Sequence, residues 1–385
     1  MPAFYEFFAG GGMVRAGLGT DWSCLFANDF DQKKGDSYKA NWGRKELLVD
    51  DIRNIGIDDL PGHADLIWGS FPCQDLSLAG GGAGLRGDRS GTFYPFMNII
   101  QELKDCGRAP KIIALENVVG TLTSHKGADF SAICHELRKL DYRFGAVVVD
   151  AAAFVPQSRP RLFVVAVHNS VTVPTPLMST DGPCPWHTKA LRRAYEALDP
   201  ELHRPWIWWK MPTLPGRQID LSDVIEDKPN SVKWHTAAET TALLSMMSEV
   251  NLAKVETAKH SKTRMVGTIY KRTRWEHGIK VQRAEIRFDD IAGCLRTPAG
   301  GSSRQLIMVV EGAKIRSRLI SSRETARLMG LPDTYKLPDR YNQAYHLTGD
   351  GVAVPVVRFI ASKIFEPCLN PTHERTSNDE SYTVR

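Results

Sequence analysis

Short apolar runs alternate with longer amphipathic stretches from Phe4 to about Val167. This alternation is typical of βαβ units, in which parallel strands are joined by helices that cover the sheet. The candidate strands are residues 5–9, 24–27, 66–69, 112–115, 145–150 and 162–167. Apolar residues at helical spacing predict helices over 92–103 and 129–140. The sequence therefore predicts an α/β fold built on an open parallel sheet.

Three candidate strands end in residues that carry chemistry. The first runs into glycines 10–12, the third is followed by Cys73 in the run 69–74, and the fourth ends in Glu116. The carboxyl ends of parallel strands form the ligand crevice of such sheets, so these groups can meet despite their separation in sequence. Each has a simpler interpretation: a sharp turn without a ligand, a small buried cysteine, and an acid that caps a turn. Their combination favours cofactor binding joined to nucleophilic catalysis.

Composition excludes several classes of protein. Hydrophobic residues make up 42% and charged residues 24% of the 385 residues, as in globular proteins. The seven cysteines are scattered without a Cys-x-x-Cys pair, which predicts neither a disulfide framework nor a metal site and favours a reducing cytoplasm. The chain shows no leader pattern and no apolar run long enough to span a bilayer, so we expect a cytoplasmic protein without a membrane partner.

The periodic pattern stops at about residues 171–176, and a loop-rich, basic region follows until about 310. Helical pattern returns at Ser321, which has capping-box spacing with Glu324. We expect a catalytic domain over 1–172, a smaller irregular domain over 173–317, and a hinge and helix over 318–345. A C-terminal helix over 346–369 then completes the catalytic domain, and 370–385 form a flexible tail.

The middle region carries a local surplus of positive charge. Between residues 254 and 287, ten lysines and arginines face three glutamates. Such a surplus suits contact with phosphates, although a charge run is also compatible with a merely solvated face. The nearby Trp206, Trp208 and Trp209 could stack on bases, but are better explained as core of the small domain.

Six motifs point to one family. They are residues 8–12, 69–74, 116–118, 157–161, 323–333 and 349–354. In order and spacing they resemble the signature motifs of the cytosine carbon-5 DNA methyltransferases of bacterial or phage type. The resemblance covers both ends of the chain and implies a Rossmann-like S-adenosylmethionine-dependent sheet. It leaves the middle unmatched, where this family carries an inserted target-recognition domain.

The resemblance implies a mechanism for its residues. Cys73 would add as a thiolate to carbon 6 of cytosine, which makes carbon 5 electron-rich enough to take a methyl group. Glu116 would hold ring nitrogen 3 and the exocyclic amine. Arg159 and Arg161 would complete the catalytic set. Because the base lies inside a duplex, the nucleotide must swing out into the pocket.

The implied cofactor is S-adenosylmethionine, and the implied partner is double-stranded DNA. The residues expected around the cofactor are Phe8, Gly10, Gly12, Asp29, Phe30, Asp51, Ile52, Pro72, Phe93, Asp350 and Val352. The residues expected to contact DNA are Gln74, Ser77, Arg86, Arg89, Arg272, Arg274, Gly300 and Gly301. The glycine-rich run 78–91 has a composition suited to closing over DNA. We also expect a monomer, with a separate restriction endonuclease as a possible companion.

Four positions depart from the family's usual pattern: Met13, Phe154, Cys294 and Asp350. They leave the nucleophile and Glu116 intact, so they bear on affinity and target more than on the type of reaction. Three alternatives remain at this point. The chain could be a nicotinamide-dependent oxidoreductase, a tRNA cytosine methyltransferase on the same scaffold, or a DNA-binding module without catalysis. The long basic middle favours duplex DNA, and the intact Cys73 and Glu116 favour an enzyme.

Overall fold

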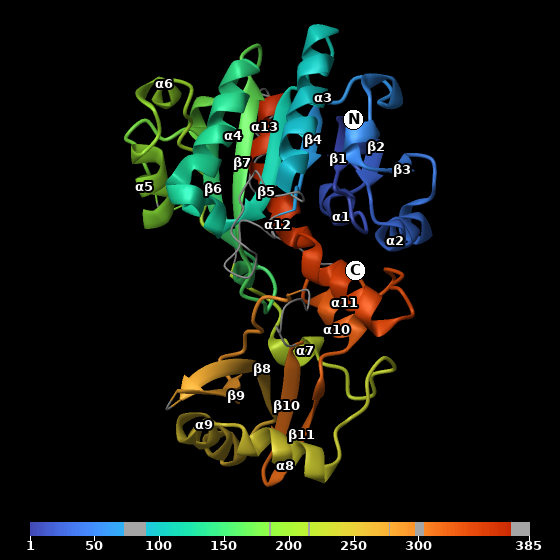
Figure 1. Cartoon of the computed structure of the whole chain (residues 1–385), viewed down its shortest axis with the longest axis vertical. Helices are drawn as coiled ribbons and strands as arrows, with labels where there is room; N and C mark the ends of the chain where they lie inside the picture. Colours follow the sequence, from blue (N-terminus) through green and yellow to red (C-terminus); the bar gives the residue numbers. More distant parts are fainter. Residues whose placement is uncertain (73–89, 185, 215, 277, 297–303, 371–385) are drawn as a thin grey trace. The chain divides into compact units, whose positions relative to one another are not determined.

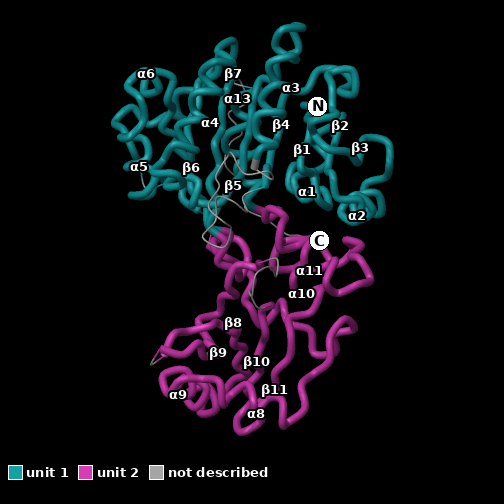
Figure 2. Tube along the Cα trace, viewed as in Figure 1, with its two compact units in different colours: residues 1–150, 160–214, 356–385 teal, residues 151–159, 215–355 magenta. Residues whose placement is uncertain are grey.

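The computed structural model describes residues 1–72, 90–184, 186–214, 216–276, 278–296 and 304–370. The chain divides into two compact units (Figure 2). Unit 1 comprises residues 1–150, 160–214 and 356–385, and unit 2 comprises 151–159 and 215–355. Residues 173–214 thus belong to the first unit and 318–355 to the second. The division by compactness differs from the domain boundaries expected for function, which remain predictions.

Unit 1 is built on a seven-stranded sheet with the order β3-β2-β1-β4-β5-β7-β6. Its strands are β1 (Ala3–Phe7), β2 (Ser23–Asp29), β3 (Leu47–Val49), β4 (Leu66–Gly69), β5 (Ile112–Val118), β6 (Tyr142–Asp150) and β7 (Pro160–His168). The pairs among β1 to β5 are parallel, whereas β7 pairs antiparallel with both β5 and β6. The expected α/β fold is confirmed, with one reversed strand that the apolar pattern did not predict.

Helices cover both faces of this sheet (Figure 1). They are α1 (Met13–Leu18), α2 (Gln32–Trp42), α3 (Phe93–Asp105), α4 (Ala128–Lys139), α5 (Lys189–Glu196), α6 (Pro200–His203), α12 (Val354–Ile360) and α13 (Glu366–Leu369), with a π-helical turn at Ala361–Phe365. The core on one face combines Tyr5 and Phe7 of β1 with α3 and α4. On the other face, Phe365 packs against Trp22 and Trp68 with ring centroids 6.4 and 6.3 Å apart. Strand residues point alternately to the two faces, and both faces are covered, so β4 is buried throughout and β1 is buried from its second residue on.

The tryptophans of the middle region belong to unit 1. Trp206 packs edge to face on Phe130 and Phe144, with centroids 6.1 and 5.9 Å apart, and Trp208 lies 5.3 Å from Trp206. Trp206 and Trp209 are buried. The expectation that these rings form the core of the small domain is therefore wrong. Their apolar surface closes the edge of the large sheet beside β6, where Phe144 bridges to Trp206.

Unit 2 contains a four-stranded antiparallel sheet of order β11-β10-β8-β9. Its strands are β8 (Met265–Glu276), β9 (Ile279–Arg287), β10 (Leu306–Glu311) and β11 (Lys314–Leu319). Its helices are α7 (Leu221–Val224), α8 (Ala237–Ser245), α9 (Glu249–Lys259), α10 (Ser322–Arg327) and α11 (Tyr341–Asp350). Apolar residues of α8 and α9 and one face of the sheet form a separate core.

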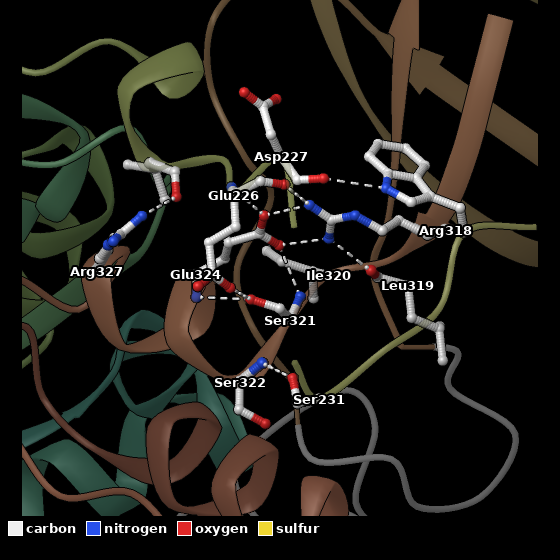
Figure 3. A network of polar contacts seen from close by, with 12 residues as sticks. Glu226, Asp227, Ser231, Arg318, Leu319, Ile320, Ser321, Ser322, Glu324 and Arg327 are labelled. Carbon is white, nitrogen blue, oxygen red and sulfur yellow. Dashed lines mark hydrogen bonds and ion pairs between the residues drawn. The ribbon is translucent and has the colours of Figure 1, made fainter. Parts of the chain in front are cut away.

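A buried polar network joins β11 to α10 in unit 2 (Figure 3). The side chains of Arg318 and Glu324 are both 0% exposed, and their closest nitrogen and oxygen lie 2.5 Å apart. Glu324 also accepts the backbone N–H of Ser321 at 2.6 Å and that of Glu226 at 2.7 Å. Ser321 accepts the N–H of Glu324 in return, which confirms the predicted capping box. The Arg318–Glu324 pair thus connects the start of α10, the end of β11 and the segment that contains Glu226.

No helix among the described residues is long and apolar enough to cross a membrane.

Candidate functional site

The turn after β1 requires glycine. The backbone is left-handed at Gly10 (φ +56°) and Gly12 (φ +77°), a region in which side chains are rarely tolerated. A Cβ atom on Gly12 would lie 2.4 Å from Nε1 of Trp42, which donates a hydrogen bond to the Gly11 carbonyl at 3.0 Å. Phe8 is also left-handed, at φ +59°. The chain is held in a tight loop in which Gly10 is partly exposed and Gly11 and Gly12 are buried.

Asp29, at the end of β2, fixes this loop. One carboxylate oxygen accepts the N–H of Gly10 at 2.8 Å, and the other accepts the N–H of Asp31 at 2.9 Å. Burial raises the pKa of the Asp29 carboxyl, since only 5% of the residue is exposed. Each oxygen of a carboxylate has a second lone pair, so Asp29 retains acceptor capacity for a hydroxyl group. This arrangement fits the ribose of an adenosyl cofactor.

Residues that follow the ends of β2 and β3 lie close to this acid in the sheet. Asp29 pairs in register with Val49 of β3, and Ile52 follows that strand, buried to 3% exposure. Asp51 accepts the N–H of Arg53 and so starts the short helix that holds Ile52. Phe30 is 69% exposed, which is unusual for a phenylalanine. An aliphatic side chain, an exposed ring and an acid fit the adenine part of the same cofactor.

Phe71 and Pro72 follow β4, and Phe93 begins α3. The rings of Phe71 and Phe93 lie 5.2 Å apart, and both residues are buried. The Asn117 side chain, at the end of β5, donates to the Phe71 carbonyl at 3.4 Å. The predicted nucleophile Cys73 lies outside the described residues, immediately after Pro72. The ends of β4 and β5 are thus tied together just before the thiol.

Glu116 of β5 and Arg161 of β7 form a nearly buried ion pair. Nε of Arg161 lies 3.0 Å from Oε1 of Glu116, and the side chains are 14% and 9% exposed. The antiparallel register places Val118 opposite Arg161, which brings the two charged side chains to the same end of their strands. A guanidinium in this position keeps the carboxylate oriented despite its burial. The two predicted site residues are therefore brought together.

Arg159 lies just before β7 and belongs to unit 2. Its buried guanidinium donates to the carbonyls of Leu295 at 3.1 Å, Gly349 at 2.8 Å and Gly351 at 2.7 Å. It therefore holds the segment that contains Asp350 and Val352, of which the first is exposed and the second buried. A role of Arg159 in fixing this segment was not anticipated from the sequence.

The predicted DNA-contact residues divide into two groups. Gln74, Ser77, Arg86, Arg89, Gly300 and Gly301 lie outside the described residues. Arg272 and Arg274 are exposed on β8, and both contact Glu285 of β9. The charge count along the sequence includes Glu285 but does not show that it pairs with these two arginines.

Two further residues of the site were missed. The Asn28 amide donates to the carbonyls of Leu48 and Asp50 at 3.1 and 2.9 Å, which fixes the end of β3 against β2. Asn117 does the same for the ends of β4 and β5. Both are buried amides at the next-to-last residue of a largely apolar strand. That position is the sequence signal that could have identified them.

Comparisons with known proteins show the family of this chain. A family model described as C-5 cytosine-specific DNA methylase matches residues 3–366. The Type II methyltransferase M.HhaI of Haemophilus parahaemolyticus is 24% identical over 94% of this chain and 93% of its own length. The Type II methyltransferase M.HaeII of Haemophilus aegyptius is 27% identical over 93% of this chain and 91% of its own length.

Solved structures show the same fold. A mutant form of Spodoptera frugiperda DNMT2 matches with a TM-score of 0.61 and 18% identity, covering 94% of this chain and 99% of its own. The Entamoeba histolytica methyltransferase EhMeth matches with a TM-score of 0.59 and 16% identity, covering 95% and 98%.

Proposed function

This chain belongs to the C-5 cytosine-specific DNA methylase family and is a DNA (cytosine-5-)-methyltransferase that uses S-adenosylmethionine, and on that premise we propose the residues that carry the reaction. The observation that supports the assignment most is the buried Glu116–Arg161 ion pair at the end of β5. It supplies a carboxylate of fixed orientation at the carboxyl ends of the strands. The glycine loop follows β1 at the same ends, and the chain after β4 continues to Cys73.

Cys73 is the proposed nucleophile. Cytosine carbon 5 is a poor nucleophile, and addition of the Cys73 thiolate to carbon 6 turns the ring into an enamine whose carbon 5 is electron-rich. Pro72 and Phe71 lead the chain to this position, and the Asn117 amide holds Phe71. After methyl transfer, the proton on carbon 5 leaves to water and the thiolate is expelled, which restores the free enzyme.

Glu116 is the proposed reader of the base and stabiliser of the developing charge. Addition of the thiolate builds negative charge toward ring nitrogen 3, where the Glu116 carboxyl hydrogen-bonds, and the same group accepts from the exocyclic amine. Arg161 keeps the carboxyl oriented through the 3.0 Å contact. The proposed role of Arg159 is indirect, because it holds in place the two carbonyls that flank Asp350.

S-adenosylmethionine supplies an electrophilic methyl group on a sulfonium. The residues proposed to hold it are Phe8, Gly10 and Gly12 at the methionine part and Asp29 at the ribose, with Phe30, Asp51, Ile52, Pro72 and Phe93 around the adenine, and Asp350 and Val352 completing the set. The left-handed turn at Gly10 and Gly12 and the acceptor capacity of Asp29 support this arrangement.

The proposed substrate is one cytosine within a short double-stranded sequence, swung out of the helix for reaction. Contacts with the duplex come from Gln74, Ser77, Arg86, Arg89, Gly300 and Gly301, with Arg272 and Arg274 adding positive charge. We assign residues 173–317 to target recognition and 318–345 to the hinge. A monomer acting in the cytoplasm, with a separate cognate endonuclease, completes the proposal; the Type II names of the relatives support the last point.

Bisulfite sequencing of DNA from cells that express the wild type, Cys73→Ala or Glu116→Gln tests the proposal. We expect methylcytosine in one short sequence context for the wild type and none for Cys73→Ala. Unchanged cytosines in the wild-type culture, or methylation that persists in Cys73→Ala, would overturn the assignment. Methyl label found in tRNA instead of DNA would identify the substrate as RNA.

A further inference from the structure

Beyond the sheet of unit 2, two strands continue as a ribbon. The ladder between β10 and β8 ends at Ile269, whereas β8 and β9 remain paired out to Glu276 and Ile279. We call residues 270–276 and 278–285 the distal ribbon; β8 and β9 are labelled in Figure 1. At its end, Trp275 is 70% exposed and Ile279 is 66% exposed. Such exposure of large apolar side chains on a protruding element marks an interaction surface.

One face of the distal ribbon neutralises much of its own charge. Side chains directly opposite each other in an antiparallel pair share a face, so Arg272, Arg274, Arg283, Glu276 and Glu285 lie together. Glu285 lies 3.3 Å from Nε of Arg272 and 2.6 Å from Nε of Arg274. Glu276 lies 2.7 Å from Nε of Arg283. Three arginines are thus held by two glutamates on what we call the arginine face.

The opposite face carries no carboxylate in the described part of the ribbon. It presents Lys271, Thr273 and Trp275 of β8 and Lys280 and Gln282 of β9, and we call it the lysine face. Nζ of Lys280 lies 5.2 Å from the centre of the Trp275 ring, directly across the pair. Thr273 faces Gln282 two pairs further in, which is the next pair on the same face, and both are exposed. At the inner end, Ala284 is buried in the core of unit 2, and its N–H donates to the Met246 carbonyl at 3.0 Å.

We propose that the lysine face of the distal ribbon is the surface that reads the sequence of the DNA substrate. This rests on the proposed function and deepens it. The major groove admits a two-stranded β-ribbon, and a face with cations and without carboxylates is complementary to its phosphate walls. Gln282 and Thr273 stand where base edges are met, and a glutamine side chain can pair with adenine through two hydrogen bonds.

The other groups of this face carry no base identity of their own. Lys280 contacts a phosphate, and Trp275 offers an aromatic surface to bases, a contact that tolerates every sequence. The arginine face adds only general attraction, because Glu285 and Glu276 already engage its guanidiniums. Base reading is therefore confined to the lysine face, since strand alternation assigns neighbouring residues to opposite sides.

The first experiment measures sequence preference. Purified full-length wild type, Gln282→Ala, Thr273→Val and the matched control Arg283→Gln methylate a randomised short duplex library, and the modified sequences are read by bisulfite sequencing. We expect Gln282→Ala to lose roughly tenfold or more of the discrimination at one base pair. The control should keep the wild-type preference. Full activity with an unchanged preference in both Gln282→Ala and Thr273→Val would overturn the proposal.

The second experiment measures the salt dependence of binding to a short duplex without methyl donor. Lys280→Gln should lower the slope of log affinity against log salt by about one. Trp275→Ala should weaken binding roughly tenfold at an unchanged slope. Glu285→Gln should strengthen binding slightly, because it removes one negative charge from the ribbon. A slope that changes for the double variant Arg272→Gln/Arg274→Gln but not for Lys280→Gln would assign DNA contact to the arginine face and refute our choice.

The two experiments separate the proposals from each other. If the wild type binds duplex DNA but methylates none of it, the proposed function fails, and the salt experiment still decides between the faces. If the wild type methylates one sequence and the lysine-face variants keep both preference and salt slope, the function stands and the inference fails.

Discussion

Two buried Glu–Arg pairs, one in each compact unit, look alike by charge but differ in how fully the carboxylate is used. Glu324 of unit 2 accepts from both terminal nitrogens of Arg318 and from the backbone N–H groups of Ser321 and Glu226. Within the described part of the chain, Arg161 is the polar partner of Glu116 in unit 1. The first carboxylate is saturated, and the second keeps acceptor capacity for a ligand.

This difference distinguishes a structural pair from a functional one. A saturated buried pair contributes to the fold because removal of one partner leaves an uncompensated charge. A buried carboxylate of fixed orientation that fills only some of its acceptor positions loses its hydration without gaining a full set of hydrogen bonds. This energetic cost is usual for a group that is kept ready for a substrate. Burial and charge alone would not separate the two; the count of hydrogen bonds does.

The largest expected effect is on catalysis by Glu116→Gln. We expect kcat to fall by roughly 10² to 10⁴, because the amide cannot give a proton to ring nitrogen 3 as negative charge builds there. The free energy of unfolding should change by less than about 1.5 kcal/mol, since the amide oxygen can still accept from Arg161. Single-turnover kinetics and urea unfolding measure the two quantities. Glu46→Gln, which alters another Glu–Arg pair of the same unit, is the control and should leave kcat within about twofold.

Arg318→Met should lower the free energy of unfolding and leave catalysis unchanged. It leaves Glu324 buried without its cation and should lower the free energy of unfolding by about 3 to 5 kcal/mol, while the folded fraction keeps its activity per molecule. Lys259→Met removes the exposed pair with Glu256 in the same unit and should cost less than about 1 kcal/mol. Equal losses for the two variants, measured by urea unfolding, would contradict the assignment of Arg318 to the fold.

A third buried carboxyl group, Glu6 of β1, lacks a close ion pair among the described residues, and its titration should make the stability of the protein depend on pH. Burial raises the pKa of Glu6 to about 8, against an opposing attraction from Arg15. The folded state therefore holds a proton that the unfolded state releases above about pH 4.5, and stability is lost as the pH rises from there to about 8.

Glu6→Gln removes this titration. Relative to the wild type, its free energy of unfolding should rise by up to about 1.4 kcal/mol per pH unit between pH 5 and 8 and then level off. Urea unfolding of both proteins across this range measures the difference. A difference that does not depend on pH would show that Glu6 is ionised in the folded protein.

The smallest expected effects come from the same conservative change at both pairs. Arg318→Lys loses the forked contacts with Glu324 and Glu226 and should cost about 1 to 3 kcal/mol of stability. Arg161→Lys should cost under about 1 kcal/mol but reduce kcat roughly tenfold, because the carboxylate is then less well oriented. If both variants lose stability alike and keep kcat, the distinction between the pairs fails.

Local pattern predicted much of the large unit. Buried strands such as β4 and β5 are continuous apolar runs with clear ends, and α3 and α4 show apolar residues at helical spacing. The three-residue β3 was missed, because so short a strand has no periodicity. The reversed direction of β7 was also missed, since an apolar run reads the same in both directions.

The candidate site could be predicted at positions whose role requires one particular residue type. Glycines 10 and 12, Asp29 and Glu116 all stand at strand ends, and the structure places them at the ends of β1, β2 and β5. Arg159 and Arg161 show the limit of such reasoning. They stand two residues apart in one motif, yet Arg161 pairs with Glu116 in unit 1 and Arg159 binds carbonyls in unit 2.

By itself, the sequence determined the sheet-forming pattern, the glycine turn, the capping box at Ser321 and the family, because each depends on residues close together along the chain. Only the tertiary structure decided which charges are engaged: that Glu285 holds Arg272 and Arg274, that Glu324 is saturated, and that Trp206 joins the large core. These outcomes depend on partners distant in sequence or on the face to which strand register assigns a side chain. A count of charges along the sequence shows neither the distant partner nor the face of the strand.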